Sequence, residues 1–225
     1  MTETTPSFRK QLFVQLEGVA KAFSNKYRLE IIDYLGQSDR SVEQIAELIG
    51  TSISNTSQHL GVLKAAGLVK TRTEGHYVVY SLSDIEVLSI YTAMEALAEK
   101  RSKEIQQLVD NFLISKDPLK PISLDELEQM RQTEDVVLLD VRPEKEFASG
   151  HITGSFNMPL EKLRAQLAEL PKDKIIVAYC RGPLCILAFE AIALMRANGL
   201  ETRRLESGFP QWLIRNRDEQ VKPSV

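Results

Sequence analysis

Both cysteines of the chain lie in one short loop that could support thiol chemistry. Cys180 follows the apolar run of residues 175–178, and Cys185 precedes a helical pattern. A thiolate at the carboxyl end of a strand lies where open α/β sheets bind ligands, and N–H groups at the start of the next helix stabilise its charge. The Gly182-Pro183 pair between the cysteines requires a tight, exposed turn. The pattern therefore favours a reactive thiol over two cysteines buried for packing.

The residues around this loop form a set of motifs that covers about half of the chain. They are Asp140, Arg142, Glu146, Phe147, Gly150, His151, Asn157, Pro159 and the run from Gly208 to Trp212. This stretch resembles a single-domain rhodanese, a sulfurtransferase that carries sulfane sulfur as a persulfide on one cysteine. The resemblance implies that Cys180 is the nucleophile. It also implies that backbone N–H groups of the following loop surround the bound sulfur. The loop residues are Arg181, Gly182, Pro183, Leu184 and Cys185.

Three polar residues of the resemblance are expected to support the loop. Asp140, Arg142 and His151 would hold the frame through ion pairs and hydrogen bonds, in preference to acting on the substrate directly. The resemblance implies no cofactor. It implies a small sulfur donor, such as thiosulfate or a persulfide.

The fifth position after Cys180 departs from the family pattern. Sulfurtransferases often carry Arg, Lys or a hydroxyl residue there, whereas this chain has Cys185, which leaves Arg181 as the only cation inside the loop. Related phosphatases and arsenate reductases use a longer loop with an Arg at the position of Ile186, so those activities are disfavoured. The two thiols could instead close a disulfide or trap a sulfur bridge if their Cα atoms lie within roughly 7 Å.

The composition excludes several classes of protein. No apolar run in the 225 residues approaches the ~18 residues of a membrane span, and the first ten residues have no apolar signal region. The net charge of −3 creates no strong field toward nucleic acid or acidic lipid. Two cysteines in one loop suit a reducing compartment. We expect a cytoplasmic protein with no membrane partner.

A short charged segment with two prolines divides the chain into two expected domains. Residues 116–122 lack apolar periodicity and are typical of a semi-rigid linker between residues 1–115 and 123–225. In the second part, strands expected at residues 136–139, 175–179 and 202–205 alternate with helices. That alternation predicts an α/β domain with a parallel sheet.

The first part of the chain contains two short helices joined by a tight turn. A capping box at residues 41–44 opens the first of them, which ends at Gly50, and Thr51 or Ser52 caps a second helix that runs to about Ala66. Two short helices joined by a three-residue turn with a glycine are typical of a helix-turn-helix.

The second of these helices has a polar face. The exposed side is expected to hold Ser54, Asn55, Ser57, Gln58 and His59, and the buried side Ile53, Leu60 and Leu63. Such polar side chains can donate to base edges and phosphates without much net charge. Residues 68–72 and 77–82 then form a β-hairpin, a wing that carries Lys70, Arg72 and His76.

The order of helix-turn-helix and wing resembles the winged-helix ArsR/SmtB repressors over residues 8 to about 113. The resemblance implies a double-stranded DNA operator. It also implies a homodimer formed by the first helix and a long last helix at residues 84–113. The alternative is that this last helix packs on the second half of the same chain. The usual metal sites of that family are missing, because residues 41–49 contain no Cys and residues 82–112 no His. We therefore expect no metal site.

The two parts together predict an α+β winged helix-turn-helix domain followed by an α/β rhodanese-like domain with a parallel sheet. We interpret the chain as a transcriptional regulator, a repressor that senses or transfers sulfane sulfur through a persulfide on Cys180. Two alternatives remain open at this point. One is a sulfurtransferase tethered to DNA without gating, and the other is a regulator whose inactive rhodanese domain only binds other proteins.

Overall fold

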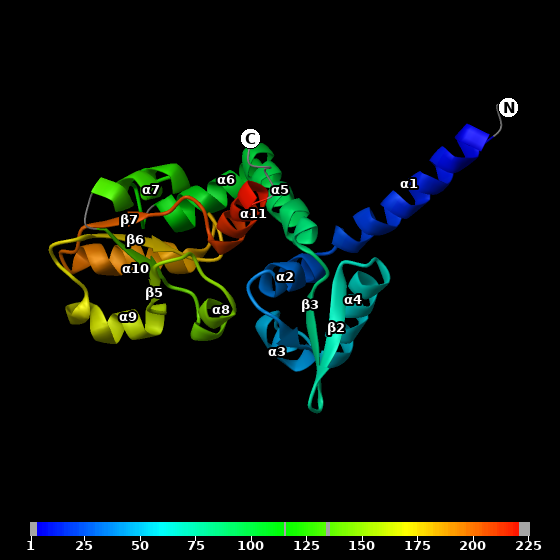
Figure 1. Cartoon of the computed structure of the whole chain (residues 1–225), viewed down its shortest axis with the longest axis horizontal. Helices are drawn as coiled ribbons and strands as arrows, with labels where there is room; N and C mark the ends of the chain where they lie inside the picture. Colours follow the sequence, from blue (N-terminus) through cyan, green and yellow to red (C-terminus); the bar gives the residue numbers. More distant parts are fainter. Residues whose placement is uncertain (1–3, 115, 134–135, 221–225) are drawn as a thin grey trace. The chain divides into compact units, whose positions relative to one another are not determined.

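The computed structural model describes residues 4–114, 116–133 and 136–220. Its contacts divide the chain into two compact units, Met1–Tyr91 and Thr92–Val225. Figure 1 shows the secondary structure of both, and each unit is described by itself. None of the described helices is both long and apolar enough to cross a membrane.

The first unit is a winged helix with one long helix and three shorter helices that have side-chain N-caps. Its elements are α1 Thr4–Phe23, α2 Lys26–Leu35, β1 Arg40–Ser41, α3 Val42–Leu48, α4 Ile53–Ala65, β2 Val69–Glu74 and β3 Tyr77–Leu82. The predicted capping box is present, since the Ser41 and Gln44 side chains accept from each other's backbone N–H groups. The Ser52 side chain accepts from the Asn55 N–H and so fixes the start of α4.

A three-stranded antiparallel sheet in the order β1-β3-β2 completes this unit. The two long strands pair from Val69 with Leu82 to Glu74 with Tyr77, which leaves a two-residue turn. Gly75 in that turn has φ +59°, a conformation that favours glycine. The hairpin confirms the predicted wing.

The buried side of α4 differs in one residue from the prediction. Leu60 and Leu63 are fully buried in the core, but Ile53 is 51% exposed and Thr56 is buried instead. Ile53 is the first residue of the helix, where the core no longer covers it. Thr56 tolerates burial because its hydroxyl donates to the Ser52 carbonyl within the helix.

The long last helix expected at residues 84–113 is interrupted. It is divided into α5 Ile85–Arg101, α6 Lys103–Val109 and a π-helical turn, η1 Asp110–Ile114. Ser102 has an extended backbone between α5 and α6, and its hydroxyl accepts from the Ile105 N–H. A serine that caps a new helix competes with continuation of the old one. The bounds of α5 cross from the first unit into the second.

The second unit is a parallel sheet in the order β5-β4-β6-β7 with helices on both faces. Its remaining elements are α7 Leu124–Thr133, β4 Val136–Asp140, α8 Glu144–Ser149, β5 Ser155–Asn157, α9 Leu160–Gln166, η2 Leu167–Glu169, β6 Ile175–Tyr179, α10 Ile186–Ala197, β7 Thr202–Arg204 and α11 Phe209–Gln220. One core cluster joins the sheet to α9 and α10, and another joins it to α7 and α11 (Figure 1). The predicted α/β domain is confirmed.

The segment expected to be a linker carries a buried carboxylate. Asp117 is 3% exposed. Its two oxygens accept from Arg196 at 2.6 Å and from Arg204 at 3.3 Å. Arg204 is the last residue of β7, the edge strand next to β6, and Arg196 lies in the last turn of α10. The described part of this segment is therefore attached to the second unit.

Candidate functional site

The cysteine loop connects the end of β6 to the start of α10. Cys180 directly follows the strand and is 1% exposed, and Cys185 is the half-buried N-cap residue of the helix. The Cys185 N–H donates to the Gly182 carbonyl at 3.2 Å, which closes the turn. The two cysteines are joined as a disulfide, with Cα atoms 6.2 Å apart. That separation lies inside the range that disulfides use.

The cation of the loop is already occupied. The Arg181 guanidinium donates from Nε and Nη2 to the two carboxylate oxygens of Glu146, at 3.0 and 2.7 Å. Glu146, in α8, is fully buried, and the Arg181 side chain is 19% exposed. A bidentate pair of this kind fixes the guanidinium plane and neutralises its charge. The sequence motif contained Glu146, but the partner of Arg181, 35 residues away, could not be predicted from it.

A second ion pair, between Arg142 and Asp140, is fully buried. Arg142 and Asp140 have no exposed side-chain surface, and their closest approach is 2.7 Å. Arg142 also donates to the Gly150 carbonyl at 2.7 Å, and its guanidinium lies 4.4 Å from the centre of the Phe209 ring. These contacts link the loop after β4 to the ends of α8 and α11. They are contacts of a scaffold.

His151 is placed differently from the two charged residues. It is exposed, and its ring stacks on Phe147 with centroids 3.9 Å apart. Its Nδ1 lies 3.0 Å from the Phe147 carbonyl. The structure therefore groups His151 with α8, whereas Asp140 and Arg142 lie in the buried frame.

The start of α11 presses directly on the cysteine loop. A Cβ atom on Gly208 would meet the Gly182 nitrogen at 2.3 Å and the Arg181 carbonyl carbon at 2.4 Å. The Phe209 N–H donates to the Cys180 carbonyl at 3.1 Å. Only a residue without a side chain fits this approach, which explains the glycine at the head of the last rhodanese motif.

Tyr179 is a residue of the site that sequence reasoning missed. Its hydroxyl accepts from the Ile152 N–H at 3.0 Å and lies 3.0 Å from the Ser155 hydroxyl. Burial raises the pKa of the Tyr179 phenol well above its usual value, and the nearby Asp140 carboxylate adds to the effect. The hydroxyl stays protonated and links the segment before β5 to β6, the strand that directly precedes Cys180.

In the first unit, the polar face of α4 separates into two groups. Ser54, Ser57 and Gln58 are exposed, while Asn55 and His59 are half-buried. Asn55 donates to the Thr51 hydroxyl at 2.9 Å, and the His59 ring lies 5.4 Å from the ring of Tyr27. Burial lowers the pKa of His59, and the positive charge of Arg28 lowers it further. His59 therefore brings little positive charge to this face near neutral pH.

The wing carries fewer available cations than its sequence suggests. Arg72 pairs with Asp39 and with Glu74, and hydrogen bonds to these two carboxylates raise the pKa of its guanidinium. Lys70 is exposed and donates to a backbone carbonyl, and His76 is exposed in the turn. Lys64, which the sequence analysis did not select, is exposed in the last turn of α4 and donates to Thr71 on β2 at 3.0 Å.

Comparison with known proteins identifies both units. A family model described as a rhodanese-like domain matches residues 123–215, and one described as a helix-turn-helix domain matches residues 23–72. The HTH-type transcriptional regulator Rv0324 of Mycobacterium tuberculosis is 37% identical over 203 residues, which cover 90% of this chain and 89% of that protein. The chain belongs to the ArsR-type winged-helix regulators that carry a rhodanese-like domain.

Two further relatives each match one half of this regulator. A sulfurtransferase of Allochromatium vinosum is 30% identical over 86 residues, 38% of this chain and 78% of that protein. The homodimeric winged helix-turn-helix domain of a possible ArsR-family regulator from Mycobacterium bovis is 32% identical. It covers 44% of this chain and 92% of that chain, with a TM-score of 0.42.

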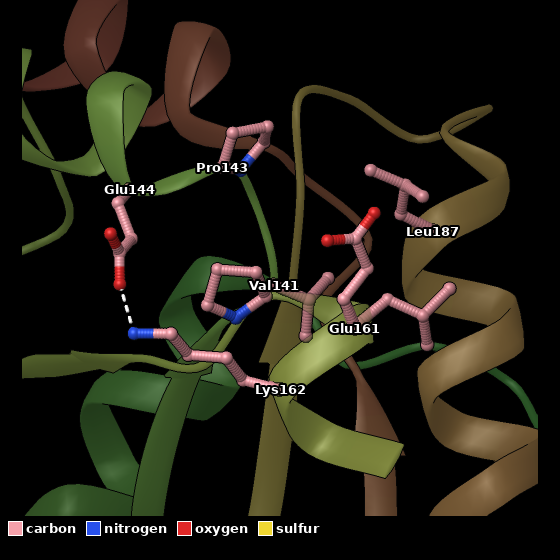
Figure 2. A pocket seen from close by; sticks show the side chains of 8 residues that line it. Val141, Pro143, Glu144, Glu161, Lys162 and Leu187 are labelled. Atoms are coloured by element: carbon pink, nitrogen blue, oxygen red, sulfur yellow. Dashed lines mark hydrogen bonds and ion pairs between the residues drawn. The ribbon is translucent and has the colours of Figure 1, made fainter. Parts of the chain in front are cut away.

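The rhodanese-like unit of the regulator also contains a hollow beside the first turn of α10 (Figure 2). Its volume is about 430 Å³. Val141, Leu160 and Leu187 form apolar walls, and an ion pair between Glu144 and Lys162 lies at one side. The three apolar residues pack in the same core cluster as the two cysteines. A hollow with apolar walls and a charged edge can take the carbon part of a small ligand.

Proposed function

We propose that this regulator represses transcription from a double-stranded DNA operator and that its rhodanese-like domain controls the repression. Cys180 takes up sulfane sulfur as a persulfide, and the sulfur state of the loop changes the affinity for DNA. The observation that carries the proposal is the position of Cys180 at the carboxyl end of β6, in a rhodanese-type loop that ends at a helix N-terminus. N–H groups there lower a thiol pKa below its free value of about 8.5.

The charge balance of the loop favours a persulfide over thiosulfate as the donor. Thiosulfate is a dianion and needs a cation for binding, but the Arg181 guanidinium is bound on two sides by Glu146. The reacting group of an organic persulfide, RSS⁻, carries only one negative charge.

The DNA contact is proposed for α4 and the wing. Ser54, Asn55, Ser57, Gln58 and His59 would face the major groove, and Lys70, Arg72 and His76 the adjacent backbone. The exposed residues of α4 support this assignment. Because Arg72 is paired with two carboxylates, few phosphates are neutralised. The slope of log affinity against log salt should then be shallow, since each neutralised phosphate contributes about −0.9.

A homodimer is proposed from the apolar surface of α1 and α5. Large side chains on α1 are exposed, among them Phe8 at 69% and Val14 at 61%, and Leu97 on α5 is 60% exposed. A soluble monomer seldom leaves so many large apolar residues in contact with water on one helix. A second copy of the chain that covers these helices would pair two recognition helices for a palindromic operator.

The second half of α5 could transmit a change in the cysteine loop to the helices proposed to form the dimer. A Cβ atom placed on Gly182 would lie 3.8 Å from the carboxylate of Glu95, so this helix reaches the loop. The same helix begins in the winged-helix unit at Ile85. A change in the loop can therefore act on α5 directly, in addition to the anchored segment that follows η1.

The test is DNA affinity at one salt concentration, before and after sulfur loading. A duplex selected from a random library by the reduced protein serves as the operator. Treatment with an organic persulfide should change its Kd by roughly 5- to 150-fold, the usual size of an allosteric coupling. Cys180→Ser should bind with the reduced affinity and ignore the donor. Equal affinity of reduced and loaded wild-type protein would leave a sulfurtransferase that is only tethered to DNA.

The recognition helix has a separate test. Gln58→Ala combined with His59→Ala should abolish the preference for the selected duplex over a random one. An unchanged preference would show that α4 does not determine the sequence that is bound.

A further inference from the structure

We propose that Cys185 is a second reactive residue of the cysteine loop. It attacks the persulfide on Cys180, releases sulfide, and leaves the Cys180–Cys185 disulfide as the lasting form of the signal. This inference rests on the proposed function, because it requires that Cys180 first accept a sulfane sulfur.

The geometry brings the two sulfur atoms together without movement of the strand or the helix. The Cα atoms are 6.2 Å apart, and the side chains are joined in the structure. The loop between them is held in place by the residues at the start of α11. The Phe209 N–H donates to the Cys180 carbonyl, and the backbone of Gly208 lies against Gly182. A fixed loop keeps the attacking and the attacked sulfur close, which raises their effective concentration.

The position of Cys185 at the head of α10 suits a nucleophile. It is the N-cap residue of a twelve-residue helix, and its side chain makes no capping hydrogen bond. The first turn of α10 contains no acidic residue that would oppose a negative charge there. The positive end of the helix dipole therefore favours the thiolate form of Cys185.

Burial gives the two cysteines different access to solvent. Cys180 is 1% exposed when the disulfide is closed, whereas Cys185 is half-buried. A disulfide-bonded Cys180 has no thiolate that can attack a donor, so it cannot accept sulfur until the bond to Cys185 has been reduced. The disulfide limits the loop to one sulfur atom for each cycle of reduction.

The two steps balance in atoms and electrons. In the first, the Cys180 thiolate attacks the outer sulfur of an organic persulfide, RS–SH, and becomes Cys180–S–SH while RS⁻ leaves. In the second, the Cys185 thiolate attacks Sγ of Cys180–S–SH, the S–S bond of the persulfide breaks, and the outer sulfur leaves with its proton as HS⁻. The sulfane sulfur is reduced to sulfide, and the two cysteine sulfurs are oxidised to the disulfide. A trisulfide bridge would need a further oxidant, so it is not the product of these steps.

The experiment uses the full chain, reduced and kept without oxygen. Wild type, Cys185→Ser and Cys180→Ser are each given one equivalent of cysteine persulfide, and sulfide and intact mass are measured. Serine is a favourable N-cap residue, so Cys185→Ser preserves the start of α10. Wild type should release about one equivalent of sulfide per chain and lose two hydrogens in mass, as thiol–disulfide exchange requires. Cys185→Ser should keep one extra sulfur on Cys180, and Cys180→Ser should do neither.

Two results would overturn the inference in different ways. If wild type keeps the extra sulfur as fully as Cys185→Ser and releases no sulfide, Cys180 accepts sulfur but Cys185 does not resolve it. If Cys185→Ser takes up no sulfur at all, the proposed function itself fails. A third arm tests the block by the disulfide, because protein with the disulfide already formed should take up no sulfur until a dithiol reduces it. Equal uptake by the oxidised protein would contradict this block.

Discussion

The contact between Gly208 and the cysteine loop allows a quantitative test. In Gly208→Ala, the new Cβ would lie 2.3 Å from the Gly182 nitrogen, and an ordinary contact begins at 3.4 Å. The loop and α11 must therefore separate by about 1.1 Å at this point, the difference between the two distances. The nearest atoms all belong to the backbone of Arg181 and Gly182, so no side chain can rotate away. Overpacking of this kind costs about 1–3 kcal/mol, and we expect the upper end.

The single tryptophan of the chain makes the effect measurable. Trp212 lies in α11 of the second unit, so its fluorescence reports the unfolding of that unit. A loss of about 3 kcal/mol should lower its midpoint by roughly 12 °C, at about 4 °C for each kcal/mol, the value between those of 100-residue and 150-residue domains. The displaced loop should also take up less sulfur from a persulfide, because the N–H groups around Cys180 move with the backbone.

Gly182→Ala provides a matched control across the same contact. A Cβ on Gly182 meets its nearest atoms, in Gln211 and Glu95, at 3.7–3.8 Å, which is ordinary contact. We expect this variant to change the free energy of unfolding by less than about 1 kcal/mol, as substitutions without a specific clash do. The reasoning is refuted if Gly208→Ala keeps the Trp212 midpoint of wild type, or if the two variants lose the same stability.

Three further perturbations have defined outcomes. Asp117→Asn leaves two partly exposed arginines without their carboxylate and should lower the free energy of unfolding, followed by Trp212 fluorescence, by about 2–4 kcal/mol. The control Asp125→Asn, at a mostly exposed ion pair, should lower it by less than about 0.5 kcal/mol. The folded pKa of His59 is lowered, so its contribution to stability is present above the unfolded pKa of about 6.5 and is lost as the pH falls through the lower, folded value. The free energy of unfolding of His59→Gln, measured in urea by circular dichroism, should therefore fall less than that of wild type when the pH is lowered from about 7.5 to about 5.5. Glu74→Gln frees part of the Arg72 charge and should strengthen binding to random duplex DNA at low salt, measured by fluorescence anisotropy; unchanged binding would place Arg72 away from the DNA.

Features set by neighbouring residues could be predicted from the sequence. The capping box at residues 41–44 and the serine cap of α4 depend on side chains within three residues of the helix start, and both are present. The alternation of apolar strands and helices likewise predicted the parallel sheet. Short-range patterns of this kind need no knowledge of the rest of the fold.

Features that depend on distant partners could not be predicted in the same way. The pair of Arg181 with Glu146 joins residues 35 positions apart, and Asp117 meets its two arginines across about 80 residues. The sequence showed charged residues in both places but could not show which of them meet. The break at Ser102 was also missed, because the apolar spacing of the flanking helices hides a residue whose hydroxyl starts a new helix.

The ion pair of Arg181 with Glu146 has a consequence for which anions can bind in the cysteine loop. An arginine guanidinium binds an oxyanion such as phosphate most strongly through two parallel N–H···O bonds. Here Glu146 occupies the guanidinium of Arg181 from inside the fold and is itself sealed from solvent. Oxyanions would have to displace a buried carboxylate to compete for the loop. On the proposed function, this ion pair would let the loop distinguish an organic persulfide from inorganic oxyanions.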